Sequence, residues 1–187
     1  MDLGPRWGEL YAAAAAQEGL FSIRQAAEAG YSPQLLAKYL QNGRVQRIRR
    51  GVYRVVHFPA GEHEDLVTVW LWSESQGVFS HETALALHEL SDVLPSRVHV
   101  TVPAAWARRR LRLPKGVALH HADIPDAERV WIGSVPVTAP LRTIADCAVA
   151  HVSPEVIERA VRDALRRGLA TEAALTAARA SVATETR

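Results

Sequence analysis

Five arginines stand in a run of eleven residues that contains no acidic residue, and they are the residues best suited to bind a ligand. They are Arg44, Arg47, Arg49, Arg50 and Arg54. Guanidinium groups held so close repel one another unless an anion neutralises them, and their planar shape matches phosphate and guanine. The run therefore predicts a surface that binds nucleic-acid phosphates with salt-dependent affinity. The alternative is a basic surface loop without a partner.

Three polar residues that precede this run have the spacing of one helix face. Gln34, Lys38 and Gln41 lie four and three residues apart, whereas the leucines and the tyrosine between them fall on the opposite side of a helix. Glutamine can pair with adenine through two hydrogen bonds, and lysine with guanine or phosphate. We therefore expect these three side chains to face DNA bases, the alternative being a solvated helix face.

Helix start signals place these residues on the second helix of a helix-turn-helix. Ser22 with Gln25 three residues later is a capping-box pattern, and Ser32 followed by Pro33 is a second start signal, which predicts a helix over residues 33–41. An alanine-rich helix is expected before them, over residues 7–18.

A β-hairpin is expected directly after the helix. Apolar residues of strand type flank Arg50 and Gly51, which form the predicted turn between residues 45 and 55. Three helices followed by a basic hairpin are the layout of a winged helix-turn-helix, which places one helix in a DNA groove and the hairpin, or wing, beside it.

Residues 20–55 resemble the amino-terminal winged helix of the AbiEi family, the antitoxins of type IV toxin–antitoxin systems. The resemblance is carried by Phe21, Ala26, Ala27, Gly30, Leu36, Gly43 and the wing residues from Arg47 to Tyr53. Two later segments, SHETALALHELSDVLPSRVHVTVP and VPVTAPLRTIADCA, also resemble the family, the second with Arg142, Thr143 and Asp146 in the expected places. The resemblance extends to roughly residue 175.

The resemblance implies a transcriptional repressor that acts as an antitoxin and regulates its own operon by binding inverted repeats in double-stranded promoter DNA. It also implies a functional partner, a nucleotidyltransferase-type toxin, neutralised without a stable complex. We expect a monomer or a weak dimer that pairs on DNA. A stand-alone winged-helix regulator, whose second domain binds a protein or RNA partner, remains the alternative.

A domain boundary is predicted at Pro59 to Gly61, where the composition changes. Residues 1–57 carry eight basic and four acidic residues, whereas the rest carries 14 and 16, so the basic charge is concentrated at one end. We expect a DNA-binding domain over residues 1–58 and an α/β effector domain over residues 59–187. The fold class is mixed, α+β with α/β, with a small mixed sheet and carboxy-terminal helices. Expected strands are residues 98–102, 117–121, 129–132 and 135–138, and expected helices are residues 62–75, 81–88, 140–150, 154–167 and 171–183.

A second basic run lies between residues 93 and 122, again without an acidic residue. It contains Arg97, Arg108, Arg109, Arg110, Arg112 and Lys115. The run is either a second anionic contact, to flanking DNA or to an RNA or nucleotide-bearing partner, or a solvated loop. We expect Trp106 to pack this loop down rather than to stack on a base.

No arrangement of residues predicts catalysis. His81 and His88 are seven residues apart, and Leu85 stands where a zinc-binding HExxH motif needs its second histidine. Gly133 and Ser134 lack the DxD of nucleotidyltransferases, and Lys115 has no acid nearby for a nuclease of the PD-(D/E)xK type. We therefore expect no enzyme, no cofactor and no metal site.

Composition excludes several further classes. The chain is 48% hydrophobic and 22% charged, which is ordinary for a folded protein. Its one cysteine, Cys147, excludes a disulfide framework within the chain and is expected in the core. The sequence shows neither a signal peptide nor an apolar span, so we expect a cytoplasmic protein without a membrane partner.

Overall fold

The computed structural model describes residues 5–92 and 94–176. By its internal contacts, the chain divides into two compact units. They are Met1–Gln76 with Gly133–Val135, and Gly77–Ile132 with Pro136–Arg187. Helices and two separate β-sheets make the fold mixed, which confirms the predicted fold class. Within the described ranges, no helix is long and apolar enough to cross a membrane.

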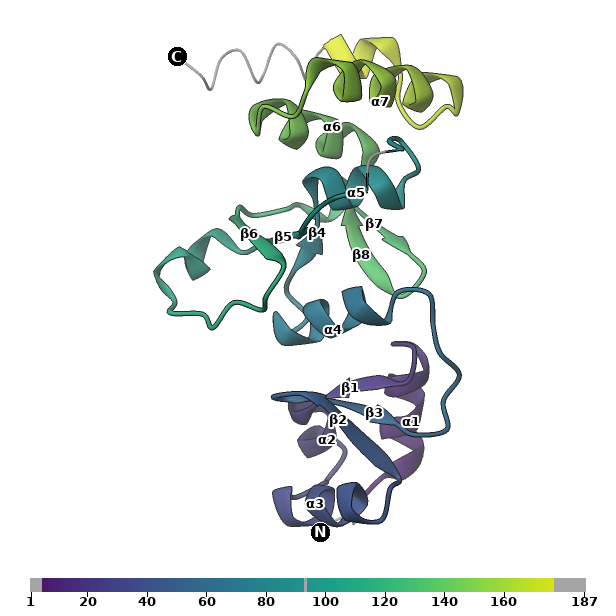
Figure 1. Cartoon of the computed structure of the whole chain (residues 1–187), viewed down its shortest axis with the longest axis vertical. Coiled ribbons are helices and arrows are strands. Elements are labelled where there is room, and N and C mark those ends of the chain that lie inside the picture. The colour runs from purple at the N-terminus through teal and green to yellow at the C-terminus, as the bar shows by residue number, and fades with distance from the viewer. Residues whose placement is uncertain (1–4, 93, 177–187) are drawn as a thin grey trace. The chain divides into compact units, whose positions relative to one another are not determined.

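The amino-terminal unit has the helices and the hairpin of a winged helix-turn-helix (Figure 1). Its elements are α1 (Trp7–Ala15), β1 (Leu20–Ser22), α2 (Ile23–Glu28), α3 (Pro33–Gln41), β2 (Val45–Arg49), β3 (Val52–Val55) and α4 (Glu64–Trp72). The strands form an antiparallel sheet in the order β1-β3-β2. The predicted helix over residues 33–41 and the predicted turn at Arg50 and Gly51 are confirmed.

Two side-chain caps start the helices of the helix-turn-helix where the sequence predicts. The Ser22 hydroxyl accepts a hydrogen bond from the Gln25 amide at 3.2 Å, and the Gln25 side chain accepts one from the Ser22 amide at 2.8 Å. The Ser32 hydroxyl accepts from the Leu35 amide at 3.2 Å. Each cap satisfies backbone donors that a helix start otherwise leaves unpaired. Between the helices Gly30 has φ +84°, a conformation that favours glycine.

A core of small and aromatic side chains joins α1, α2 and α3 to the sheet. Ala14 and Ala26 are buried where the helices approach closely, and Leu36 of α3 is 3% exposed. Phe21 of β1 stacks on Tyr53 of β3, with ring centroids 5.8 Å apart. This packing fixes the orientation of α3 within its unit.

Helix α4 groups with the amino-terminal unit. The Arg54 guanidinium pairs with the Glu64 carboxylate at 2.6 Å, and the His63 amide donates to the Glu18 carboxylate at 2.9 Å. These contacts tie the start of α4 to the winged helix. The predicted functional boundary after residue 58 stays a prediction.

The second unit is a mixed sheet with helices. Its elements are β4 (Val78–Phe79), α5 (His81–Leu87), β5 (Val98–Val102), β6 (Val117–His121), β7 (Arg129–Ile132), β8 (Val135–Thr138), α6 (Pro140–Val149), α7 (Pro154–Arg166) and the short 3-10 helices η1 (Ala104–Arg108) and η2 (Asp126–Glu128). The strand order is β6-β5-β4-β8-β7. The pairs β5–β6 and β4–β8 are parallel and β4–β5 is antiparallel, which confirms the predicted mixed sheet.

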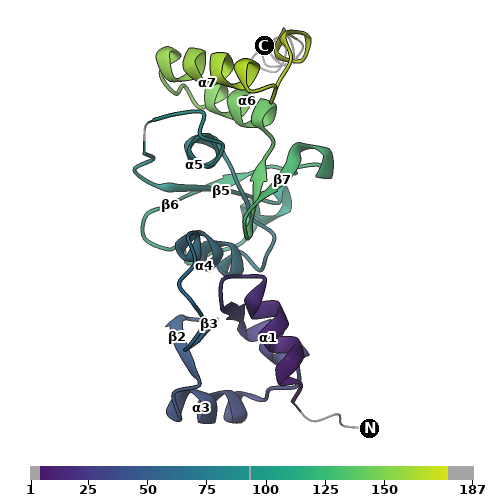
Figure 2. The same cartoon turned by 90° about the vertical axis from the view of Figure 1, so that its right-hand side faces the viewer.

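Helices α5, α6 and α7 share an apolar core, and Figure 2 shows α6 and α7 together next to α5. Leu85, Ile144 and Ala160 each contribute a buried side chain from a different helix. Cys147 is fully buried in this core, as predicted, and burial raises its pKa to about 12. Its thiol is therefore protonated at neutral pH and acts as a small apolar group.

Several expected helices are shorter than predicted. The helices predicted over residues 7–18 and 62–75 are Trp7–Ala15 and Glu64–Trp72. Of the helix expected over residues 171–183, residues 172–176 are helical, and the rest lies outside the described residues. The four strands predicted in the second unit are confirmed with the same bounds.

Candidate nucleic-acid interface

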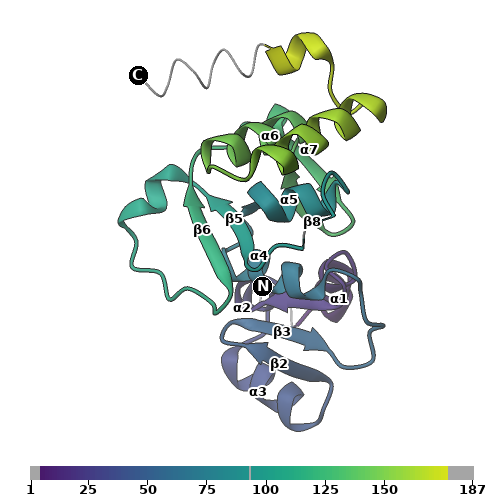
Figure 3. The ribbon, with the colours of Figure 1, turned by 45° about the horizontal axis from the view of Figure 1, so that its top comes forward.

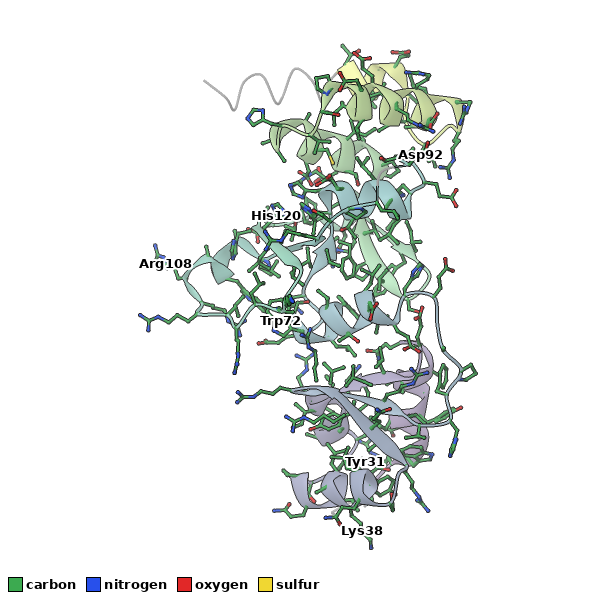
Figure 4. All side chains as sticks on the ribbon, viewed as in Figure 1. Tyr31, Lys38, Trp72, Asp92, Arg108 and His120 are labelled. Atoms are coloured by element: carbon green, nitrogen blue, oxygen red, sulfur yellow. The ribbon has the colours of Figure 1, made fainter. Side chains whose placement is uncertain are left out.

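Helix α3 presents the three predicted polar residues to solvent. Gln34, Lys38 and Gln41 are exposed, while Leu36 on the other side is buried. Figure 4 shows Lys38 pointing away from the body of its unit. The structure thus brings these side chains together on one free helix face.

Aromatic rings support α3 from behind. Tyr39 lies 5.3 Å from Tyr31 in an edge-to-face contact and 5.9 Å from Trp7, measured between ring centroids. Burial, with a hydrogen bond to Tyr39, raises the pKa of Tyr31 to about 12. These contacts pack α3 against Trp7 of α1 and Tyr31 of the turn before it.

The wing follows α3 after a short turn and carries the exposed arginines. Arg47 and Arg50 are exposed, Arg49 is half-buried, and a β-bulge lies between Arg47 and Arg49. A bulge changes the direction of the side chains that flank it. Arg44, in the turn itself, is exposed and lies over the Tyr39 ring at 5.2 Å from its centroid.

Arg54 differs from the other four arginines of the run. Its side chain is 18% exposed, pairs with Glu64 at 2.6 Å and donates to the Phe58 carbonyl at 3.0 Å. Arg54 lies on β3, the central strand of the sheet, opposite Leu20 of β1 and Gln46 of β2. Its charge is matched within the protein, which the spacing of basic residues did not indicate.

Except for Arg97, which directly precedes β5, the second basic run lies in the loop between β5 and β6, which extends away from the sheet in Figures 1 and 3. Arg97 donates to the Val117 carbonyl at 2.8 Å, and the Arg109 guanidinium stacks on Trp106 at 3.8 Å from the ring centroid. The first contact joins the starts of β5 and β6, and the second lies within the loop. The remaining members are exposed, and Figure 4 shows Arg108 pointing outward; they are Arg108, Arg110, Arg112 and Lys115.

Arg142, Thr143 and Asp146, which the family resemblance singled out, support the start of α6. The Thr143 hydroxyl donates to backbone carbonyls and lies 2.7 Å from the Thr138 hydroxyl. Arg142 pairs with Asp146 at 2.7 Å and also with Glu128. Burial raises the pKa of Asp146, and the hydrogen bond from Arg142 opposes that shift. These contacts join the sheet to the helix.

Three histidines meet in the second unit, although their spacing along the chain gave no sign of it. They are His81, His99 and His120. His88, which sequence reasoning paired with His81, instead lies buried with its Nε2 atom 2.7 Å from the Thr138 carbonyl oxygen.

The amino-terminal unit is therefore a winged helix in which α3 and the wing present polar and basic side chains to solvent. Residues 9–56, roughly a quarter of the chain, match the AbiEi_4 family model, described as "Transcriptional regulator, AbiEi antitoxin". The match confirms the resemblance seen in the sequence and supports a DNA-binding regulator. This family is a class of regulators and not a class of enzymes.

A crystal structure of the RV2827C protein from Mycobacterium tuberculosis is similar at 15% sequence identity and a TM-score of 0.42. The similarity covers 86% of this chain and 72% of that one, and at this level it supports no conclusion about function. No curated protein matches the chain.

Proposed function

We propose that this chain is a transcriptional repressor that acts as the antitoxin of a type IV toxin–antitoxin system and binds inverted repeats in its own promoter. The observation that carries the proposal is the exposed row on α3 beside four wing arginines, in the region that matches the AbiEi model. In this proposal Gln34, Lys38 and Gln41 contact base edges. Phosphates are held by Arg44, Arg47, Arg49 and Arg50.

The proposal excludes Arg54 from the phosphate contacts. A guanidinium that already pairs with a carboxylate gains little by exchanging it for a phosphate, and moving Arg54 would break its bond to the Phe58 carbonyl. The DNA-contacting charge is therefore that of the four arginines between α3 and the end of the hairpin turn.

The family match also supports a proposal for the partner and the place of action. We propose a nucleotidyltransferase-type toxin encoded by a neighbouring gene, neutralised without a stable complex. The repressor acts in the cytoplasm, where the operon is transcribed. Co-expression tests this part: the chain should restore growth of cells that make the neighbouring toxin, and failure to do so would leave a repressor that is not an antitoxin.

DNA binding is tested by titrating labelled promoter DNA with the full chain at several salt concentrations. Arg47→Ala should weaken binding to promoter and unrelated DNA alike and reduce the slope of log affinity against log salt by about one unit. Lys38→Ala should reduce binding to promoter DNA more than to unrelated DNA if it contacts a base, and equally for both if it contacts phosphate.

The matched control is Arg162→Ala, which removes an exposed arginine of α7, outside both basic runs. It should leave affinity and salt slope unchanged. Unchanged affinity across Ala variants of Arg44, Arg47, Arg49 and Arg50 would contradict the proposed interface.

A second candidate is a stand-alone regulator whose second unit binds an RNA or protein partner. Four of the exposed cations of the β5–β6 loop favour it, since the loop itself holds no acid. A variant with glutamine in place of Arg108, Arg110, Arg112 and Lys115 distinguishes a loop that binds flanking DNA from a loop that binds another partner. Loss of promoter affinity assigns the loop to flanking DNA, and loss of growth rescue with full promoter affinity assigns it to another partner.

A further inference from the structure

Histidine side chains from one helix and two strands of the second unit converge at one point. His81 begins α5, His99 lies on β5 and His120 on β6. One ring nitrogen of each lies within 4.8 Å of one from each of the others, and Nδ1 of His99 is 3.1 Å from Nε2 of His120. Figure 4 marks His120 near the sheet.

The register of the strands creates this cluster. Strands β5 and β6 run parallel, with His99 opposite Ala118 and Thr101 opposite His120. Since side chains two residues apart on a strand share a face, His99 and His120 lie diagonally on the same face of the sheet. The chain leaving β4 is held against β5 by the hydrogen bond from the Ser80 amide to the His99 carbonyl, which places His81 beside them.

Hydrogen bonds orient two of the three rings through the nitrogen that faces away from the cluster. Nε2 of His99 lies 3.3 Å from the Glu82 carboxylate, and Nδ1 of His81 lies 2.9 Å from the Ser80 hydroxyl. That hydroxyl accepts a further bond from Thr101 at 2.7 Å. Histidines that bind metals are usually held in this way, by a carboxylate or another polar group on the second nitrogen.

An imidazole ring in its neutral form offers one nitrogen lone pair to a metal ion. Burial, together with the neighbouring His120 and His99, lowers the pKa of His81 to about 3. Burial also lowers the pKa of His99, where Glu82 opposes the shift, and the pKa of His120. Imidazole nitrogens are preferred ligands of zinc, copper and nickel.

The backbone adds a separate observation. His81 has φ +52°, in the left-handed region that side chains with a Cβ atom rarely adopt. Such strain persists where the surrounding structure fixes a residue, and it concentrates at functional sites. His81, one of the three histidines whose rings meet, is such a residue.

We propose that His81, His99 and His120 bind one divalent transition-metal ion of the zinc class, with water as the fourth ligand. Three histidines and an open position are a known zinc arrangement. The 3.1 Å between the facing nitrogens of His99 and His120 suits two ligands that each lie about 2.0 Å from zinc. The His81 and His120 rings stack at 3.7 Å, so the His81 ring turns out of this stack when the ion binds. Bound metal joins the start of α5 to β5 and β6.

The test uses the full chain after dialysis against a chelator. Calorimetric titration with zinc chloride should show saturable binding of one ion per chain and a higher midpoint of thermal unfolding. Cobalt chloride should produce the visible absorption bands of four-coordinate Co²⁺. A wild-type chain that binds no zinc, or binds it without saturation, overturns the proposal.

Variants assign the ligands. His81→Ala, His99→Ala and His120→Ala should each lower zinc affinity at least about tenfold and remove the cobalt bands, and Glu82→Gln should lower affinity about 10–100-fold. His121→Ala, the neighbouring exposed histidine on β6, is the matched control and should bind as wild type does. Undiminished affinity in any ligand variant overturns the three-histidine site. If an alanine variant fails to fold, the zinc affinity of the near-isosteric Glu82→Gln variant is the deciding measurement. Wild-type zinc affinity in that variant counts against the proposal.

Discussion

At the scale of single residues, the five arginines of the basic run divide by what surrounds them. Arg47 and Arg50 are exposed on the wing, whereas Arg54 is bound by Glu64 and the Phe58 carbonyl. The sequence shows five arginines of like charge. It does not show that one of them forms an ion pair with a carboxylate ten residues later in the chain. Its position on the central strand, which depends on the pairing of β1 with β3, is also a property of the fold.

Arg54→Ala should therefore lower stability and leave the salt slope of DNA binding unchanged. The pair is partly buried, with side chains 18% and 25% exposed, so we expect a loss of about 1–2 kcal/mol in the free energy of unfolding. Urea denaturation of Arg54→Ala, Glu64→Ala and the double variant measures the coupling. Arg47→Ala is the opposite control. It should retain wild-type stability and reduce the slope of log DNA affinity against log salt. An Arg54→Ala slope as low as that of Arg47→Ala would place Arg54 on the DNA.

His88 supplies a pH dependence of stability. Burial lowers its pKa from 6.5, and Arg167 acts in the same direction, while the bond to the Thr138 carbonyl opposes the shift. The unfolded chain therefore takes up a proton on this ring at a higher pH than the folded chain does. The contribution to stability is present above about pH 6.5 and is lost as the pH falls below it.

His88→Gln removes this titration and retains a donor for the Thr138 carbonyl. Urea unfolding at about pH 7.5 and about pH 5.5 should show a smaller loss of stability on acidification in the variant than in wild type. His81, His99 and His120 also have lowered pKa values, so the variant should retain part of the acid sensitivity. An equal loss in both proteins would show that His88 does not contribute.

At the scale of elements, local signals were sufficient for the capped start of α3 and for the strands of the second unit that have four or five residues. Ser32 and Pro33 start α3 through a cap within three residues, and β5 to β8 are runs of strand-forming residues between clear breaks. The strands β1 and β4 have only three and two residues, and each exists because a partner strand offers its backbone. No local pattern marks them.

The histidine cluster shows the same limit at the site. Spacing along the chain argued against a metal site at His81 and His88. They are seven residues apart, and a helix brings close only residues three or four apart. His99 and His120 meet through the parallel pairing of β5 with β6, which sets them on one face. The residue types were visible in the sequence, and their meeting point required the sheet register.

At the scale of the whole molecule, the size of α3 limits how sequence specificity can arise in the proposed DNA interface. Helix α3 has nine residues and presents three exposed polar side chains, which can read few base pairs. In the proposed interface the wing arginines hold phosphates, which adds affinity without sequence information. We therefore expect two copies to read two half-sites of an inverted repeat, as a weak dimer or as monomers that pair on DNA.

Spacing between the half-sites tests this expectation. After footprinting of the promoter, a duplex with both half-sites should bind more tightly per site than a duplex with one, because contacts between two bound copies add to those with DNA. Inserting about five base pairs should abolish this gain, since it turns one half-site to the opposite side of the helix, and inserting about ten should restore part of it. Fluorescence anisotropy gives the affinities, and analytical ultracentrifugation gives the number of copies bound. Equal affinity per site at every spacing would show that the copies bind independently, and specificity would then have to come from contacts outside α3.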